Sequence, residues 1–186
     1  MQNPAHHRRD FWSCFHEVTK DCRSAVEPGC GTGRNLRQLH PDCGVLLGIE
    51  VHEPYIHRIP NDKIRFIVGD LRKELLALPS NYVDLFLMID VLEHLELVDA
   101  VELLNQADRI ATKRILLWVP EGAYIQNAEH HTDEAPYTHW LEHRSIWYRG
   151  ALKRLGYDVA VWPNYHLHLP TGEMKIGAMF CVKERP

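Results

Sequence analysis

The chain has 186 residues, of which 45% are hydrophobic, enough for one well-buried core and too few for two full-sized domains. Its 21 basic and 25 acidic residues leave a formal net charge of −4. This balance disfavours a nucleic-acid partner, because proteins that bind polyanions usually carry a clustered basic surface.

Five cysteines lie along the chain, an odd number, and no two of them have the C-x-x-C spacing of a zinc or redox site. We interpret them as reduced thiols. No apolar run approaches the ~20 residues needed to span a bilayer, and the first residues, MQNPAHHRRD, lack the apolar core of a signal peptide. We therefore expect a cytoplasmic protein without a membrane span.

Short apolar runs alternate with longer amphipathic segments, a pattern that predicts βα units and a mostly parallel sheet. A helix is expected near residues 10–22, where Phe11, Phe15 and Val18 recur at helical spacing. Strands are expected at 24–27, 45–50, 64–69, 83–89, 114–120, 158–162 and 177–182, and helical segments at 36–39, 92–111 and 145–155. We expect a single domain over 1–186, with a helical N-terminal segment at 1–23 and a substrate loop at 121–142.

The stretch AVEPGCGTGRN, residues 25–35, places three glycines within five positions. A strand ending at Glu27 and a helix starting near Gly33 would be joined by a bare backbone that can turn sharply and touch a ligand, and the helix start would offer free N–H groups. The dinucleotide pattern G-x-G-x-x-G fails, because it would need glycine at Arg34 or Leu36. A P-loop fails because no Gly-Lys-Ser/Thr follows.

The remaining pattern, E-x-G-x-G-x-G at Glu27, Gly29, Gly31 and Gly33, resembles motif I of the class I S-adenosylmethionine (SAM) dependent methyltransferases. Three more features follow in the order of that family: Glu50 at the end of the second strand, Asp70 just past the third, and DVLEHL, starting at Asp90, after the fourth. The resemblance spans residues 24–184. One departure is the absence of a Pro-Gly-Gly turn before the fifth strand.

The resemblance implies an α/β fold of the Rossmann-like, doubly wound kind: a mostly parallel seven-stranded sheet with an antiparallel last strand and helices on both faces. It also implies SAM as the cofactor, with Glu50 accepting both ribose hydroxyls and Asp70 near the adenine amino group. The cofactor-binding residues expected on this basis are Glu27, Gly29, Cys30, Gly31, Thr32, Gly33, Asn35, Glu50, Val51, Asp70, Leu71, Asp90 and Val91.

Methyl transfer requires that the acceptor be aligned with the S–CH₃ bond, and a hydroxyl or amine acceptor must also lose a proton. The family often carries a histidine at the start of the helix before the sixth strand, the place of His143. Since histidine titrates near pH 6.5, we expect His143 to be the catalytic base, with His94 as the second candidate. The alternative for His143 is a helix cap or a surface residue.

A helix starting at Asp90 would place Asp90, Glu93 and His94 on one face. Together with His143 they resemble the metal set of small-RNA 2′-O-methyltransferases and of some quinone-pathway O-methyltransferases, a set suited to Mg²⁺, Mn²⁺ or Fe²⁺. We expect no metal, because DVLEHL also occurs in metal-free relatives. The spaced histidines His130-His131 and His166-x-His168 are expected to be surface residues.

Three functions remain open. The leading one is methyl transfer to an oxygen or nitrogen atom of a small molecule, such as a metabolite, a sugar or a lipid intermediate, by a monomer or homodimer. The second is an RNA 2′-O-methyltransferase, which would need a basic rim; the candidates are Arg144, Arg149, Lys153 and Arg154. The third is a SAM-binding subunit without catalysis.

Overall fold

The computed structural model describes residues 10–58, 63–124, 137–166 and 176–186. Seven strands form one sheet in the order β3-β2-β1-β4-β5-β7-β6. The strands are β1 (Ser24–Pro28), β2 (Val45–Glu50), β3 (Ile64–Val68), β4 (Val83–Ile89), β5 (Ala111–Glu121), β6 (Asp158–His166) and β7 (Ile176–Glu184). The first five pair in parallel, and β7 runs antiparallel between β5 and β6. This confirms the predicted fold and all seven predicted strands.

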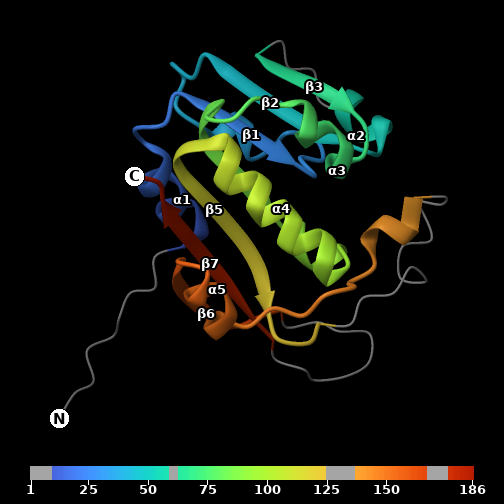
Figure 1. The fold of residues 1–186 in the computed structure, drawn as a ribbon, viewed down its shortest axis with the longest axis vertical. Helices are drawn as coiled ribbons and strands as arrows, with labels where there is room; N and C mark the ends of the chain where they lie inside the picture. The colour runs from blue at the N-terminus through green and yellow to red at the C-terminus, as the bar shows by residue number, and fades with distance from the viewer. Residues whose placement is uncertain (1–9, 59–62, 125–136, 167–175) are drawn as a thin grey trace.

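Helices lie on both faces of this sheet. The α-helices are α1 (Phe11–Thr19), α2 (Glu53–His57), α3 (Leu71–Glu74), α4 (Leu97–Ile110) and α5 (Arg149–Arg154), and 3-10 turns occur at η1 (Leu36–Gln38), η2 (Leu75–Ala77), η3 (Leu92–His94) and η6 (Tyr137–Leu141). Figure 1 shows α4 lying across the front of the sheet. Asp10 begins α1 as its N-cap, because its carboxylate accepts a 3.0 Å hydrogen bond from the Ser13 N–H.

Successive side chains of the central strands point to opposite faces of the sheet, so the core has two layers. In β4, Phe86 and Met88 point to one layer, which also contains the buried face of α4. Leu85 and Leu87 point to the other layer, where Phe15 of α1 packs. Both faces of β4 are therefore covered, which explains why this strand is almost continuously apolar.

The predicted helix after the glycine-rich loop is wrong. Only the three-residue turn η1 follows, since Gly33 has a φ of +75° and Pro41 comes eight residues later. Too little chain lies between them for a stable helix. The predicted helical N-terminus beside the loop is therefore absent, and the N–H groups there belong to irregular backbone.

The predicted helix over 92–111 is divided into η3 and α4. Asp90 has a φ of +53°, so the chain turns out of β4 in a left-handed conformation and cannot start a helix there. Asp90, Glu93 and His94 are thus not neighbours on one helix face, contrary to the prediction. The predicted helix over 145–155 also begins late, at Arg149.

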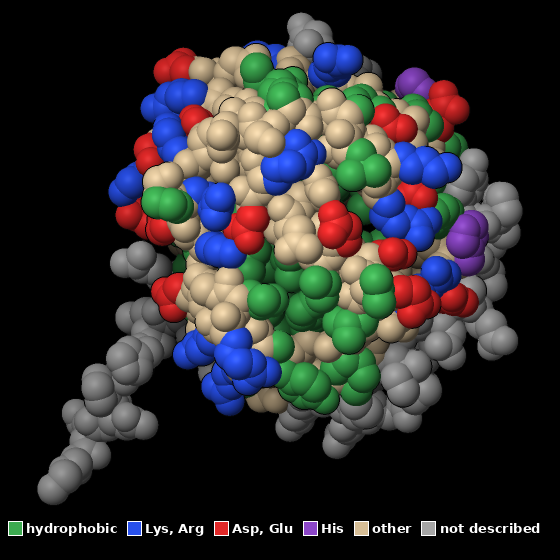
Figure 2. Space-filling view, viewed as in Figure 1, with side chains coloured by type: hydrophobic (Ala, Val, Ile, Leu, Met, Phe, Trp, Pro, Cys, Tyr) green, Lys and Arg blue, Asp and Glu red, His purple; other side chains and the backbone are tan. Residues whose placement is uncertain are grey.

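One face of the molecule exposes apolar side chains. They belong to the start of α4 (Leu97, Val98, Val101) and to the segment leading into α5 (Ile146, Tyr148), and hydrophobic side chains gather in the lower half of the view in Figure 2. Within the described ranges, no helix is long and apolar enough to cross a membrane. The monomer or homodimer expected from the sequence stays a prediction.

Candidate functional site

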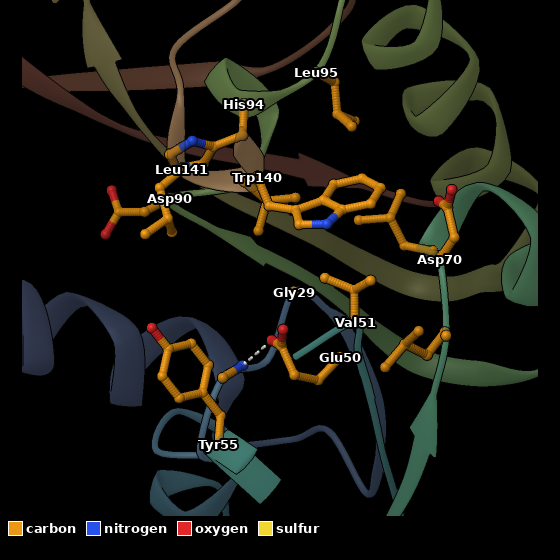
Figure 3. Close-up of a pocket in the computed structure, with 15 residues that line it drawn as sticks. Gly29, Glu50, Val51, Tyr55, Asp70, Asp90, His94, Leu95, Trp140 and Leu141 are labelled. Carbon is orange, nitrogen blue, oxygen red and sulfur yellow. Dashed lines mark hydrogen bonds between the residues drawn. The ribbon is translucent and has the colours of Figure 1, made fainter. Parts of the chain in front are cut away.

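A cleft opens where β1, β2 and β4 end, and parallel sheets usually place ligands at this edge. Its volume is about 170 Å³. The cleft is lined by Gly29, Gly31, Ile49, Glu50, Val51, Tyr55, Gly69, Asp70, Leu71, Asp90, Val91, His94, Leu95, Trp140 and Leu141. In Figure 3, Asp90 and Asp70 lie at opposite ends of the cleft, and the Trp140 indole lies between them.

The glycine-rich loop forms the floor of the cleft. Gly29 has a φ of +67°, and a Cβ there would come within 2.7 Å of a Val91 methyl group, so this glycine lets the loop approach the end of β4. Gly31 has a φ of +54°, and a Cβ there would meet nothing within 4 Å. The space above Gly31 is therefore open for a ligand.

Glu50 fixes this loop from the end of β2. Its Oε2 accepts a hydrogen bond of 2.8 Å from the Gly31 N–H, and its Oε1 accepts one of 2.9 Å from the His52 N–H. The first of these bonds is drawn in Figure 3. Because each carboxylate oxygen has two acceptor positions, Glu50 retains one on each oxygen for a ligand in the cleft.

Asp70 lies at the far end of the cleft and is held by Arg72. The guanidinium donates to both carboxylate oxygens, with Nη2 to Oδ2 at 2.6 Å and Nε to Oδ1 at 3.0 Å. The same Arg72 also reaches Asp99 at 2.9 Å. The hydrogen bonds from Arg72 lower the pKa of Asp70, so this carboxylate stays ionised and fixed in position.

Glu27 is completely buried beneath the loop. Its Oε1 accepts a hydrogen bond of 2.6 Å from the Asn35 side-chain amide, while its Oε2 has no hydrogen-bond partner. Burial raises the pKa of Glu27 to about 8. A buried carboxylate with an unpartnered oxygen is costly unless a donor or a cation reaches it.

Eight of the thirteen residues predicted for the cofactor line the cleft: Gly29, Gly31, Glu50, Val51, Asp70, Leu71, Asp90 and Val91. The other five, Glu27, Cys30, Thr32, Gly33 and Asn35, are not among the residues that line it. A Cβ on Gly33 would meet Ile64 and Phe66 at 3.0 Å, so this glycine permits packing against β3. Cys30 is buried in the core beside Gly48, and burial raises the pKa of its thiol.

The sequence prediction missed Trp140. Its indole lies across the cleft, close to Asp70 (Figure 3), and the Arg72 guanidinium sits 5.7 Å from the centre of its ring. The cleft is smaller than the ~300–1,000 Å³ of most ligand sites. A nucleoside therefore enters only if the Trp140 indole shifts, or if the indole moves to stack on the base of the nucleoside. The signal in the sequence that could have identified Trp140 was an aromatic residue within the polar segment that follows β5.

Asp90 occupies the other end of the cleft in a left-handed conformation. Its N–H donates to the Trp118 carbonyl at 2.9 Å, which holds the end of β4 against β5. The surrounding protein raises the pKa of Asp90 to about 6 by desolvation. Asp90 therefore ionises closer to neutral pH than an ordinary aspartic acid.

Glu93, His94 and His143 form a compact cluster beside Asp90. One ligand atom from each of the three lies within 4.8 Å of the others, and the two imidazole rings meet edge to face at 4.8 Å. Glu93 is 2% exposed and its Oε2 has no hydrogen-bond partner. Burial, followed by the nearby Asp90 carboxylate, raises the pKa of Glu93.

Backbone contacts bring His143 to this position. The Arg144 and Ser145 N–H groups both donate to the Glu93 carbonyl, at 2.7 and 3.1 Å, which is why no helix forms before Arg149. The ring atom Nδ1 of His143 lies 2.7 Å from the Tyr124 carbonyl, and that of His94 lies 3.2 Å from the Glu142 carbonyl. Because a carbonyl only accepts, each Nδ1 carries the proton, and the lone pair of each neutral ring is on Nε2.

His94 lines the cleft, whereas His143 lies behind it. Of the spaced histidines, His130, His131 and His168 lie outside the described residues. His166 is half-buried, its ring packs on Tyr124 at 4.8 Å, and burial lowers its pKa. The expectation of a simple surface position is therefore wrong for His166.

Residues 26–117 match a protein-family model described as a methyltransferase domain. The match covers β1 to β5 and thus the glycine-rich loop, Glu50, Asp70 and Asp90. None of the curated proteins matches the chain.

Solved structures of methyltransferases resemble the whole fold. The N-terminal domain of EvdMO1, determined in the presence of S-adenosylhomocysteine (SAH) and D-fucose, is 17% identical with a TM-score of 0.62, and the match covers 94% of this chain and 81% of that one. A putative methyltransferase from Bacillus halodurans is 10% identical with a TM-score of 0.62, covering 95% and 99%. The methyltransferase domain of bacterial CtHen1 is 15% identical with a TM-score of 0.53, covering 91% and 96%. At these identities the likeness shows the fold alone.

Proposed function

Since this chain carries a class I SAM-dependent methyltransferase domain, we propose that it transfers the methyl group of SAM to an oxygen or nitrogen atom of a small molecule. The observation that carries the proposal is the cleft at the ends of β1, β2 and β4. Gly31, with open space beside it, the carboxylate of Glu50 and Asp90 all line this cleft. The net charge of −4 supports a small-molecule acceptor over a polyanion.

Several features of the cleft and of the glycine-rich loop suit SAM as a ligand. A Cβ on Gly31 would meet nothing within 4 Å, so the loop itself leaves space for the ligand beneath Trp140, and the two remaining acceptor positions of Glu50 suit the paired ribose hydroxyls. The buried Oε2 of Glu27, without a hydrogen-bond partner among the described residues, lies beneath the same loop, and an ammonium group of the ligand nearby would favour its ionised form. Glu27 and Asn35 would act through the loop, because neither side chain lines the cleft.

When bound, SAM supplies a methyl group that is already activated by the sulfonium charge. The task of the chain is to hold the acceptor in line with that group and to keep water out. Asp90 and His94 line the end of the cleft where the acceptor would approach. For the acceptor's proton, the first candidate base is His143, whose Nδ1 is held by the Tyr124 carbonyl so that Nε2 can accept. The second is His94, which lines the cleft and packs against His143.

We expect Glu50→Ala to weaken SAM binding by about 1–3 kcal/mol, or about 5- to 150-fold, because hydrogen bonds to a charged group are lost. The variant also frees the Gly31 N–H from its anchor. Calorimetry with SAM and with SAH measures the effect.

The matched control is Glu53→Ala. Glu53 is an exposed acid three residues along the chain and pairs with His57 at 3.6 Å. It should leave SAM affinity unchanged. Normal binding by Glu50→Ala would contradict the assignment of Glu50 to the ribose.

A screen tests the reaction class. Labelled SAM is incubated with the protein and with cell extract separated into RNA, protein, lipid and small molecules. Label should enter the small-molecule or lipid fraction. Label in RNA, lost steeply as salt rises, would overturn the proposal in favour of an RNA methyltransferase, and SAM binding without transfer to any fraction would indicate a non-catalytic subunit.

The cluster of Glu93, His94 and His143 favours a second candidate, a methyltransferase that uses a divalent metal. A buried carboxylate oxygen without a partner and two imidazoles fixed through Nδ1 form a set that suits a cation. Asp90 would complete the four residues considered from the sequence, although it does not belong to the three whose ligand atoms lie together. Oxygen and nitrogen ligands in this mixture suit Mg²⁺, Mn²⁺ or Fe²⁺.

Chelation separates the two candidates. If the cluster holds a metal that the reaction needs, a chelator abolishes turnover and added Mg²⁺ or Mn²⁺ restores it, while the affinity for SAH stays the same. Glu93→Gln should weaken metal binding, measured by calorimetry with Mn²⁺ alone. Full activity in excess chelator would reject the metal-dependent reaction and leave the metal-free one.

A further inference from the structure

A second cleft adjoins the first, between α1 and the ends of β4, β5 and β6. Its volume is about 650 Å³, within the range of small-molecule sites. Five aromatic residues line it, Phe11, Trp12, Trp118, Trp162 and Tyr165, together with Arg34 among its polar residues. Among the described residues, the cleft is lined by α1, the glycine-rich loop and the strands β4, β5 and β6.

The aromatic rings of this cleft hold each other in fixed orientations. Trp118 is the central ring: Phe11 lies 5.0 Å from it, Trp162 5.4 Å and Tyr165 4.9 Å, all near edge-to-face. Trp118 itself is 3% exposed, whereas Tyr165 is 50% exposed. The exposed ring of Tyr165, held in place by this contact with Trp118, suits a flat ligand, because offset or edge contacts between rings are favourable.

One arginine, Arg34, lines the cleft together with the carboxylates of Asp10 and Asp90. Arg34 is exposed, and its guanidinium lies 5.4 Å from the centre of the Trp12 ring. Among the described residues it forms no ion pair or hydrogen bond. The carboxylate of Asp10, which also lines the cleft, is already engaged as the cap of α1, accepting from both the N–H and the hydroxyl of Ser13. Arg34 is thus available for an anionic group of a ligand.

The two clefts share one residue, Asp90. In Figure 3, Asp90 lies at the end of the first cleft opposite Asp70. If the adenine end lies toward Asp70 and the ribose at Glu50, the methyl group lies toward Asp90. The aromatic cleft therefore opens beside Asp90, where a methyl acceptor must lie.

We propose that the aromatic cleft binds the methyl acceptor, and that this acceptor is a planar aromatic acid, packed against Tyr165 and Trp162 with its anionic group paired to Arg34. This inference rests on the proposed function, whose SAM site it extends. Non-planar sugars fit the cleft less well, because they offer no flat ring to Tyr165 and no charge to Arg34.

Equilibrium binding tests the inference without a known substrate. With saturating SAH, the intrinsic tryptophan fluorescence is titrated with 1-naphthoate, with its uncharged analogue 1-naphthalenemethanol and with glucuronate, an acid without an aromatic ring. We expect 1-naphthoate to bind most tightly and glucuronate not at all. Arg34→Gln should weaken 1-naphthoate by about fivefold and leave the uncharged analogue unchanged.

Two variants complete the experiment. Arg154→Gln, an exposed arginine of α5, should change neither affinity. Trp162→Leu should weaken both naphthyl ligands, with SAH binding as evidence that the variant is folded. If SAH binds but 1-naphthoate does not, if Arg34→Gln has no effect, or if glucuronate binds equally well, the inference is wrong while the proposed function stands. If SAH itself does not bind, the proposed function is wrong.

Discussion

Replacement of Gly31 by valine is expected to abolish SAM binding. Gly31 adopts a φ of +54°, a region that β-branched residues rarely enter, at a cost of about 1–3 kcal/mol. Its Cβ position faces open space in the cleft, so the two methyl groups of valine would fill the volume that the ligand needs. Both effects act against binding, and we expect at least about a 100-fold loss of affinity.

The matched control for this variant is Gly44→Val. A Cβ on Gly44 also meets nothing within 4 Å, but Gly44 lies outside the cleft and does not have a positive φ. It should bind SAM normally. Circular dichroism should show that the Gly31 variant keeps its secondary structure, and binding by that variant at wild-type affinity would contradict the placement of SAM over this loop.

The pattern of the strands and the glycine-rich loop could be predicted because both depend on local sequence. Buried parallel strands are almost continuously apolar, as in β4, and the length of the apolar run before Glu50 indicates that this carboxylate ends its strand. The boundaries of the following segments could not be predicted in this way. The helix expected from Asp90 onward fails because Asp90 turns into a left-handed conformation to meet the Trp118 carbonyl, a contact between distant parts of the chain.

The residues that complete the site depend on such long-range contacts. Trp140 enters the cleft from η6, and His143 reaches His94 because two N–H groups next to it bind the Glu93 carbonyl. No hydrophobic periodicity in the sequence predicts either contact. The aromatic cleft likewise joins α1 to β5 and β6, elements far apart in the sequence, so its rings come together only in the folded chain.

The second large effect is expected for His143→Ala, which should leave SAM affinity intact and lower turnover by ~10²–10⁴-fold, the usual contribution of a positioned base. The structure places His143 behind His94 and outside the SAM cleft, so its removal should not affect cofactor contacts. His57→Ala, an exposed histidine of α2, is the control and should retain full turnover.

The pH dependence of turnover distinguishes a base from a structural residue. A neutral imidazole takes up the acceptor's proton, so wild-type kcat/KM should fall as the pH drops and the ring becomes protonated, and this decline should be absent from the residual activity of His143→Ala. Added imidazole should restore part of the lost rate. If His143 instead binds a metal with Glu93 and His94, the chelator removes the wild-type activity and imidazole restores nothing. If the variant turns over normally in excess chelator, His143 is neither the base nor a metal ligand. The hydrogen bond from its Nδ1 to the Tyr124 carbonyl then makes His143 a structural link between two segments. Asp90 would in that case be the titratable group nearest the acceptor.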